Sequence, residues 1–271
     1  LGHTQTVAVS AALARNGMEQ VLDYLSRQHD MHLSLALVVS REDTAAKLLK
    51  TPPVTEILAG YEIAMRASEE GQQGPYMPFY QFYSEVQEKG IDPYLPAVAA
   101  GEEGTLSQGA ALFQESRLVG FLDEEETDTL LMLRGKKPSG AITVLRSQEE
   151  GGNVTFTLDT CRLTLHTALT PLGQVQGTLS LRAEVMVSEL EGDQPLLSQE
   201  GHRQLESLCS AELTQRGQAV LQKLQKEFAC DPLGLGLDLW YTFFSQTDLD
   251  LSVQVQVTGT GRMYLPAARA N

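Results

Sequence analysis

Basic residues are scarce in this chain. It has 20 lysines and arginines against 35 aspartates and glutamates, which gives a formal net charge of −15 at pH 7. A nucleic-acid-binding protein needs a basic footprint that displaces counterions from phosphates, and the nearest approach to one is the pair Lys136-Lys137. We therefore expect no DNA or RNA partner. The same charge argues against docking of the folded surface on anionic lipid headgroups.

Cysteine is also scarce, with Cys161, Cys209 and Cys230 as its only occurrences. None belongs to a C-x-x-C pair, and no histidine lies at ligand spacing from any of them. Cys209 and Cys230 fall on one helical stretch, too far apart along it to form a disulfide. We expect all three to be small buried hydrophobic residues.

Long apolar runs are missing. No stretch of about 18 apolar residues is present, so the sequence predicts no membrane-spanning helix. No signal peptide is visible either. The chain begins at Leu1-Gly2-His3 instead of methionine, and we interpret it as a fragment whose natural N-terminus has been removed.

Catalytic motifs are missing as well. No G-x-S-x-G nucleophile elbow is present, and Gly259-Thr260-Gly261-Arg262 is not followed by the helix that a dinucleotide site needs. The acidic group between Glu124 and Asp128 is typical of a helix N-terminus. His29 and His32 lack a third metal ligand. We predict no catalytic site, no metal and no cofactor.

Residues 1–102 have the pattern of a mixed α/β domain that is incomplete at its start. The continuous apolar run from Leu33 to Val39 is typical of a strand covered on both faces. The segment from Pro78 to Lys89 is aromatic at helical spacing. Gly101-Glu102-Glu103-Gly104 is a candidate domain boundary. Residues 103–136 then predict an intermediate β-β-α segment whose helix is capped by Asp123.

Residues 137–271 are dominated by amphipathic strands, for example Thr178 to Leu190 and Leu249 to Val257. In the strand from Asn153 to Ala168 the apolar face changes parity, which predicts a β-bulge near Asp159-Thr160. Ser198 to Ala229 predicts a helix about 45 Å long. An amphipathic helix with no partner helix nearby in the sequence must bury its apolar stripe against the sheet. The sequence therefore predicts an α+β fold that ends in an antiparallel sheet packed on one long helix.

The order of these segments resembles the Ger(x)C family, the C-subunit lipoproteins of bacterial spore germinant receptors. Four groups of residues carry the resemblance. One is Ala36-Leu37-Val38-Val39 followed by Ala46 and Leu49, and the other three are these. The first is Leu13-Ala14-Arg15-Asn16-Gly17 with Leu22-Asp23-Tyr24-Leu25-Ser26-Arg27, and the second is Gly109-Ala110-Ala111-Leu112-Phe113 with Leu118-Val119-Gly120-Phe121-Leu122 and Glu126-Thr127. The third is Gln225 with Asp231-Pro232-Leu233-Gly234-Leu235-Gly236 and Trp240, similar to the family's "Q … D-x-x-G-x-G" helix exit.

The resemblance implies a non-catalytic protein that acts with membrane-embedded A and B subunits in the response to nutrient germinants. It implies a location on the outer face of the spore inner membrane. It also implies an N-terminal lipid anchor on a cysteine that precedes this chain.

Three functional hypotheses remain open at the level of sequence. The first, which we favour, is a scaffold that binds protein partners. The second is an extracytoplasmic module that binds a small ligand in a pocket at the domain junction. The third is a hydrolase built on acidic residues. The candidate junction residues are Tyr94, Phe113 and Trp240.

Overall fold

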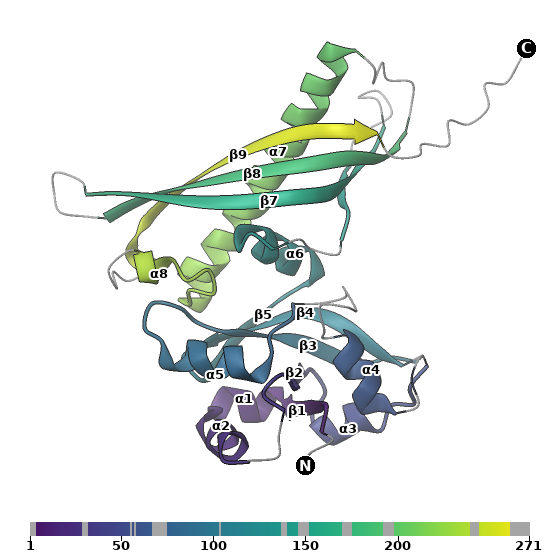
Figure 1. Cartoon of the computed structure of the whole chain (residues 1–271), viewed down its shortest axis with the longest axis vertical. Helices are drawn as coiled ribbons and strands as arrows, with labels where there is room; N and C mark the ends of the chain where they lie inside the picture. Colours follow the sequence, from purple (N-terminus) through teal and green to yellow (C-terminus); the bar gives the residue numbers. More distant parts are fainter. Residues whose placement is uncertain are drawn as a thin grey trace, which may run out of the picture.

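The computed structural model describes residues 4–28, 32–54, 56, 58–66, 75–102, 104–136, 140–145, 152–169, 175–191, 198–238 and 244–260. Two sheets lie one above the other along the long axis of the molecule (Figure 1). The mixture of helices and sheets confirms the predicted α+β class. Trp240 lies outside the described residues.

The first sheet has the strand order β1-β2-β3-β4-β5. Its first three strands are parallel, and β4 is antiparallel to both β3 and β5. The strands are β1 (Thr6–Ser10), β2 (Ala36–Ser40), β3 (Tyr94–Ala100), β4 (Thr105–Gln114) and β5 (Arg117–Leu122). Every residue of β2 is buried, which agrees with the strand covered on both faces that its apolar run predicts.

Helices cover both faces of this first sheet. On one face, Leu48 and Ile63 pack with Val38 and Val98. On the other face, α1, α2 and α5 contribute to the main core, where Leu22 and Phe82 are examples. The helices are α1 (Ala11–Asn16), α2 (Glu19–Ser26), α3 (Ala45–Leu49), α4 (Ala59–Arg66) and α5 (Phe79–Gln87).

Residues 104–136 connect the two sheets. Strands β4 and β5 pair with β3 and with each other and so extend the first sheet, and α6 (Glu124–Leu133) follows them on the side of the second sheet (Figure 1). The predicted cap of α6 is confirmed, because Asp123 and Glu126 form a reciprocal capping box. The division into residues 1–102, 103–136 and 137–271 stays a prediction.

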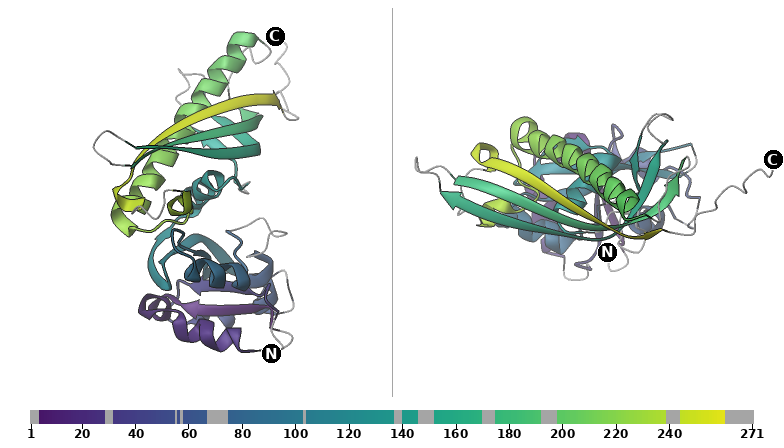
Figure 2. Two further views of the ribbon diagram at one scale, coloured as in Figure 1. Left: turned by 60° about the vertical axis from the view of Figure 1, so that its left-hand side comes forward. Right: turned by 90° about the horizontal axis from the view of Figure 1, so that it is seen from above.

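The second sheet has the order β6-β7-β8-β9, and a long helix crosses one of its faces (Figure 2). Its elements are β6 (Ile142–Val144), β7 (Val154–Leu169), β8 (Val175–Leu190), α7 (Gln199–Gln222), the π-helical turn η2 (Lys223–Phe228), α8 (Leu235–Asp238), the 3₁₀ turn η3 (Phe244–Gln246) and β9 (Asp248–Thr260). Buried residues of α7 such as Leu205 and Leu213 pack on Phe156 and Val185. The predicted long helix is confirmed. The predicted bulge is confirmed too, by a register shift between Leu158 and Thr160.

One part of the predicted sheet was wrong. Strands β6, β7 and β8 are antiparallel, but β9 runs parallel to β8, with Leu181 opposite Val253. The physical reason is the helix between them. A crossover helix carries the chain back along the sheet before β9 begins, and such a connection joins parallel strands. Alternation of apolar and polar residues shows that one face of a strand is exposed to solvent, but it does not show the direction of the neighbouring strand.

A glycine-dependent bulge shapes β4. Pro96 pairs with Ala110 and Val98 pairs with Ser107, so β4 holds one more residue than β3 between these pairs. Gly109 lies in this bulge with φ of +78°. A Cβ atom there would lie 2.2 Å from the carbonyl oxygen of Leu122, at the start of the turn into α6. Gly109, one of the residues that carry the resemblance, therefore allows two backbone segments to lie close together.

Gly109→Ala is expected to destabilise the protein by about 2–4 kcal/mol, because it adds a backbone clash to the cost of a left-handed conformation. Gly135→Ala is the matched control. Gly135 also has a left-handed φ, of +67°, but a Cβ atom added there would meet no atom within 4 Å. That change should cost about 1–2 kcal/mol. Urea unfolding followed by circular dichroism measures both, and equal costs would contradict the role of the close contact.

Candidate functional site

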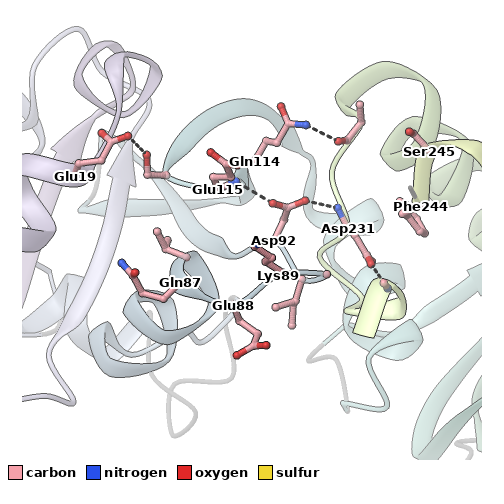
Figure 3. A pocket seen from close by; sticks show the side chains of 16 residues that line it. Glu19, Gln87, Glu88, Lys89, Asp92, Gln114, Glu115, Asp231, Phe244 and Ser245 are labelled. Atoms are coloured by element: carbon pink, nitrogen blue, oxygen red, sulfur yellow. Dashed lines mark hydrogen bonds between the residues drawn. The ribbon is translucent and has the colours of Figure 1, made fainter. Parts of the chain in front are cut away.

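A cavity of about 630 Å³ lies where the two sheets meet (Figure 3). Three segments that are distant in sequence form most of its wall: the end of α5 and the following loop, the turn between β4 and β5, and the chain that leaves η2. The wall is rich in acidic groups, which include Glu19, Glu88, Asp92, Glu115 and Asp231.

The exit of the long helix is fixed to the first sheet by packing. A Cβ atom on Gly120 in β5 would lie 2.1 Å from the ring of Phe228, so the ring lies directly on the glycine backbone. Ala229 then takes the left-handed conformation that ends the helix, with φ of 48°. The side chain of Gln114 donates a hydrogen bond of 3.0 Å to the carbonyl oxygen of Ala229. Both contacts join the exit of η2 to the first sheet.

Two aspartates continue this attachment through reciprocal hydrogen bonds (Figure 3). The backbone N–H of Asp92 donates to the carbonyl oxygen of Asp231 over 2.8 Å. The backbone N–H of Asp231 donates to Oδ2 of Asp92, also over 2.8 Å. The second oxygen of Asp92 accepts from the N–H of Glu115 at 2.8 Å. The carboxylate of Asp92 thus ties the β4–β5 turn to the helix exit.

The carboxylate of Asp231 organises the loop that follows it. Its Oδ1 accepts from the N–H of Leu233 at 3.2 Å, and its Oδ2 accepts from the N–H of Gly236 at 2.6 Å. A Cβ atom on Gly236 would lie 2.8 Å from Cα of Gly90, and one on Gly90 would lie 2.7 Å from the carbonyl carbon of Gly236. Two glycines facing each other therefore allow the two backbones to touch.

Gln225, the first residue of the "Q … D-x-x-G-x-G" pattern, also has a structural role. Its side-chain amide donates to the carbonyl oxygens of Phe244 and Thr247, at 2.8 and 2.9 Å. These residues lead into β9. The pattern thus describes one hydrogen-bonded connection in which the long helix, the loop behind it and β9 are held together.

Burial raises the pKa of Asp231 to about 6, and the nearby charge of Asp92 acts in the same direction, while the backbone N–H donors oppose the shift. Burial likewise raises the pKa of Asp92 above its usual value. Perturbed carboxyl groups in a pocket are candidates for acid–base chemistry. Here, however, each carboxylate accepts backbone hydrogen bonds at both oxygens. Their geometry is that of structural acceptors.

Two of the three predicted junction residues, Tyr94 and Phe113, are fully buried core residues outside the wall of this cavity. Phe113 packs edge-on against Phe82 at 5.0 Å between ring centroids. The guanidinium of Arg134 lies 5.0 Å from the centroid of the Tyr94 ring, and Arg134 also forms a salt bridge of 3.0 Å with Glu85. Their role at the junction stays a prediction, and Trp240 lies outside the described residues.

Sequence reasoning missed Asp92, Gly90 and Gln114 as junction residues. Nothing in their local pattern distinguishes them, because their function depends on contact with a loop more than 100 residues later in the chain. Asp231 and Gly236 belong to the "Q … D-x-x-G-x-G" pattern, but that pattern predicts only the end of a helix and no contact with the first sheet. Among the described residues no group of three or more His, Cys, Asp or Glu could hold a metal ion. None of the described helices has the length and apolarity required to span a membrane.

Comparison with known families gives two matches. The family described as "Spore germination B3/ GerAC like, C-terminal" matches residues 108–261, and the one described as "Spore germination protein N-terminal domain" matches residues 1–100.

Two curated relatives from Bacillus subtilis (strain 168) are similar to the chain. The "Putative spore germination protein YfkR" is 24% identical over 241 residues, which cover 86% of this chain and 61% of the relative. "Spore germination protein B3" is 22% identical over 267 residues, which cover 91% of this chain and 70% of the relative. The chain thus spans about three fifths of the first relative's length.

A solved structure, titled "Crystal Structure of the GerBC protein", has the same fold. Its TM-score is 0.72 at 19% sequence identity, and the match covers 94% of this chain and 79% of that chain.

The titration of Asp231 predicts a pH dependence of stability. Because its pKa is raised in the folded state, it contributes stability that is fully present below about pH 4 and is lost as the pH rises through about 6. The free energy of unfolding should therefore fall less steeply between about pH 4 and 6.5 in Asp231→Asn than in the wild type. Urea unfolding at stepped pH measures both slopes, and equal slopes would contradict the assignment.

Proposed function

The chain belongs to the Ger(x)C family of spore germination proteins, and from that premise we propose that it is the non-catalytic ectodomain of a germinant-receptor lipoprotein. In this proposal it works with membrane-embedded A and B subunits on the outer face of the spore inner membrane. Its lipid anchor lies outside these 271 residues. Its task is to position its membrane partners during nutrient-triggered germination.

The observation that carries the non-catalytic part of the proposal is the hydrogen bonding of Asp92 and Asp231. A general base must be placed so that it can take a proton from a substrate. Both oxygens of each carboxylate already accept backbone N–H groups, and the bond from the N–H of Asp231 to Asp92 joins the helix exit to the first sheet. A carboxylate that took up a proton from a substrate would weaken its own backbone hydrogen bonds and so loosen the junction. This arrangement fits a structural role for both aspartates.

The charge of the chain supports attachment by a lipid. With a formal net charge of −15, the protein is repelled by anionic headgroups and gains little from adhering to them. Covalent lipidation provides membrane affinity without basic surface, at about 0.8 kcal/mol for each buried CH₂ group. A lipid tether therefore fits this surface better than electrostatic adsorption does.

A second candidate function is the binding of a small ligand at the junction. The cavity of about 630 Å³ has the size of common ligand sites, and residues from both ends of the chain line it. A ligand there would contact Asp92 and Lys89 beside the first sheet and Ser245 beside the second. Such a ligand would couple its binding to the arrangement of the two sheets.

Spores that carry Asp92→Asn or Asp231→Asn are expected to germinate at a rate that follows the amount of protein in the membrane fraction. Loss of an acid–base catalyst would instead reduce the rate by about 100-fold or more at normal protein level. Asp23→Asn, at an exposed site paired with Arg27, is the matched control.

Purification of the full chain from spore membranes should retain the A and B subunits, and loss of both would contradict the partner assignment.

Thermal unfolding with added amino acids and sugars tests the second candidate. A ligand that binds only the folded state, at about 100 times its dissociation constant, stabilises it by about 2.7 kcal/mol. We expect no shift for the scaffold. A saturable shift that is lost when Ser245→Trp fills the cavity would favour the ligand-binding function.

A further inference from the structure

Among the described residues, much of one edge of strand β7 has no neighbouring strand. The strand pairs with β8 from Val154 to Leu169, whereas β6 covers only Val154, Thr155 and Phe156 on its other side. Within the part of the chain that the structure describes, no other strand pairs along this side. Figure 1 shows the β7–β8 ribbon projecting beyond the long helix. We call residues 162–168 the open edge.

The sequence of the open edge has little of the usual protection, with Arg162 as its one charged residue. Proteins shield exposed edges with lysine, proline or inward-pointing charges, because unpaired N–H and C=O groups recruit further strands. The open edge has the sequence Arg-Leu-Thr-Leu-His-Thr-Ala and contains no proline, lysine or acidic residue. The register shifts of β7 lie before it, and the later of them falls between Leu158 and Thr160. Among the described residues, no strand, turn or loop forms a backbone hydrogen bond with residues 162–168 on this side, so their backbone is available for pairing.

The two faces of the open edge differ in chemistry. Leu163 and Leu165 are half-buried and pack against the main core, so part of each side chain still meets solvent. Arg162, Thr164 and His166 lie on the opposite, exposed face. An added strand with apolar residues on the inner face would cover the two leucines. Its other side chains would stand beside Arg162.

Arg162 also lacks an acidic partner. Its cross-strand neighbour in β8 is Arg182, and directly opposed like charges destabilise a sheet. Neither guanidinium forms a salt bridge with any described residue, although acids outnumber bases in the chain by 35 to 20. Two adjacent guanidinium groups of this kind are suited to receive a carboxylate from outside.

We propose that the open edge binds an extended segment of a partner protein, which adds to β7 as a further strand of the second sheet. The segment places a glutamate or aspartate beside Arg162 and Arg182 and apolar side chains over Leu163 and Leu165. Strand addition of this kind takes affinity from backbone hydrogen bonds and specificity from alternate side chains. The proposal is independent of the receptor assignment, because it rests only on this edge.

A second copy of the chain fits the edge less well. Antiparallel pairing of two copies about Thr164 would place Arg162 opposite His166 and supply no carboxylate. Two molecules of charge −15 also repel each other. An anionic membrane surface fits poorly too, because Glu184 and Asp250 lie on the same exposed face of the sheet as Arg182 and repel an extended anionic plane.

The test uses the ¹⁵N-labelled full chain and a synthetic peptide of about seven residues, blocked at both ends, in which leucine alternates with threonine and one threonine is replaced by glutamate. Saturable amide shifts in residues 162–168 are expected. N-methylation of one alternate set of peptide amides should abolish binding, while the other set is tolerated, because only one edge of the peptide faces β7. Replacing the glutamate by lysine should weaken binding about fivefold.

Variants of the protein test the charge contact. Arg162→Glu should reverse the preference between the glutamate and lysine peptides, and the milder Arg162→Gln should reduce it, because Arg182 remains. Arg203→Glu, an equal charge change at an exposed site of α7, should leave the preference intact. Absence of shifts in the open edge, or tolerance of both N-methylated peptides, overturns the proposal.

Two further outcomes would also overturn it. Sedimentation could show a dimer that Leu163→Lys dissociates, which would assign the open edge to a second copy. Vesicles of phosphatidylglycerol could bind the chain through Arg162 when the glutamate peptide does not, which would assign the arginines to a membrane surface. A monomer that binds the peptide and ignores the vesicles supports the proposal.

Discussion

The reciprocal hydrogen bonds between Asp92 and Asp231 are the constraint on which the rest of the structure depends. They join the loop after α5 to the exit of the long helix. The neighbouring contact of Gly90 with Gly236 is so close that neither residue can carry a side chain without movement of the backbone. Short backbone contacts of this kind have little tolerance for sliding, so they set the distance and the angle between the two sheets.

The long helix extends this constraint through the molecule. In its first half, Leu205 and Leu213 belong to the core under the second sheet. Near its end, Val220 and Leu224 belong to the main core, together with Leu112 and Leu118 of the first sheet. One helix therefore contributes to two hydrophobic cores, and its exit is fixed by the aspartates. The helix is thus one continuous connection between the two cores.

Local patterns allowed much of the fold to be predicted. The long helix, the capped helix α6 and the bulge in β7 follow from spacing, capping and parity, which are properties of neighbouring residues. The parallel direction of β9 depends on contacts between distant segments, so periodicity could not reveal it. The pairing of β4 with β3 is local, because only residues 101–104 separate the two strands, but the glycines there were also compatible with a domain boundary. The candidate site was harder still. Its glycines and aspartates act through a partner loop far along the chain, whereas Tyr94 and Phe113 drew attention as aromatics and are core residues.

The π-helical turn between Lys223 and Phe228 has a consequence for how such proteins vary. Each residue of an α-helix advances the chain by about 1.5 Å and turns it by about 100°. Insertion or deletion of a single residue in the helix between the two cores would rotate one half of the molecule relative to the other. A wider turn absorbs one surplus residue locally and restores the phase, so that Phe228 still meets Gly120. A change in the length of the helix therefore keeps Phe228 on Gly120 when it adds whole turns, or when a π-helical turn takes up the surplus residue.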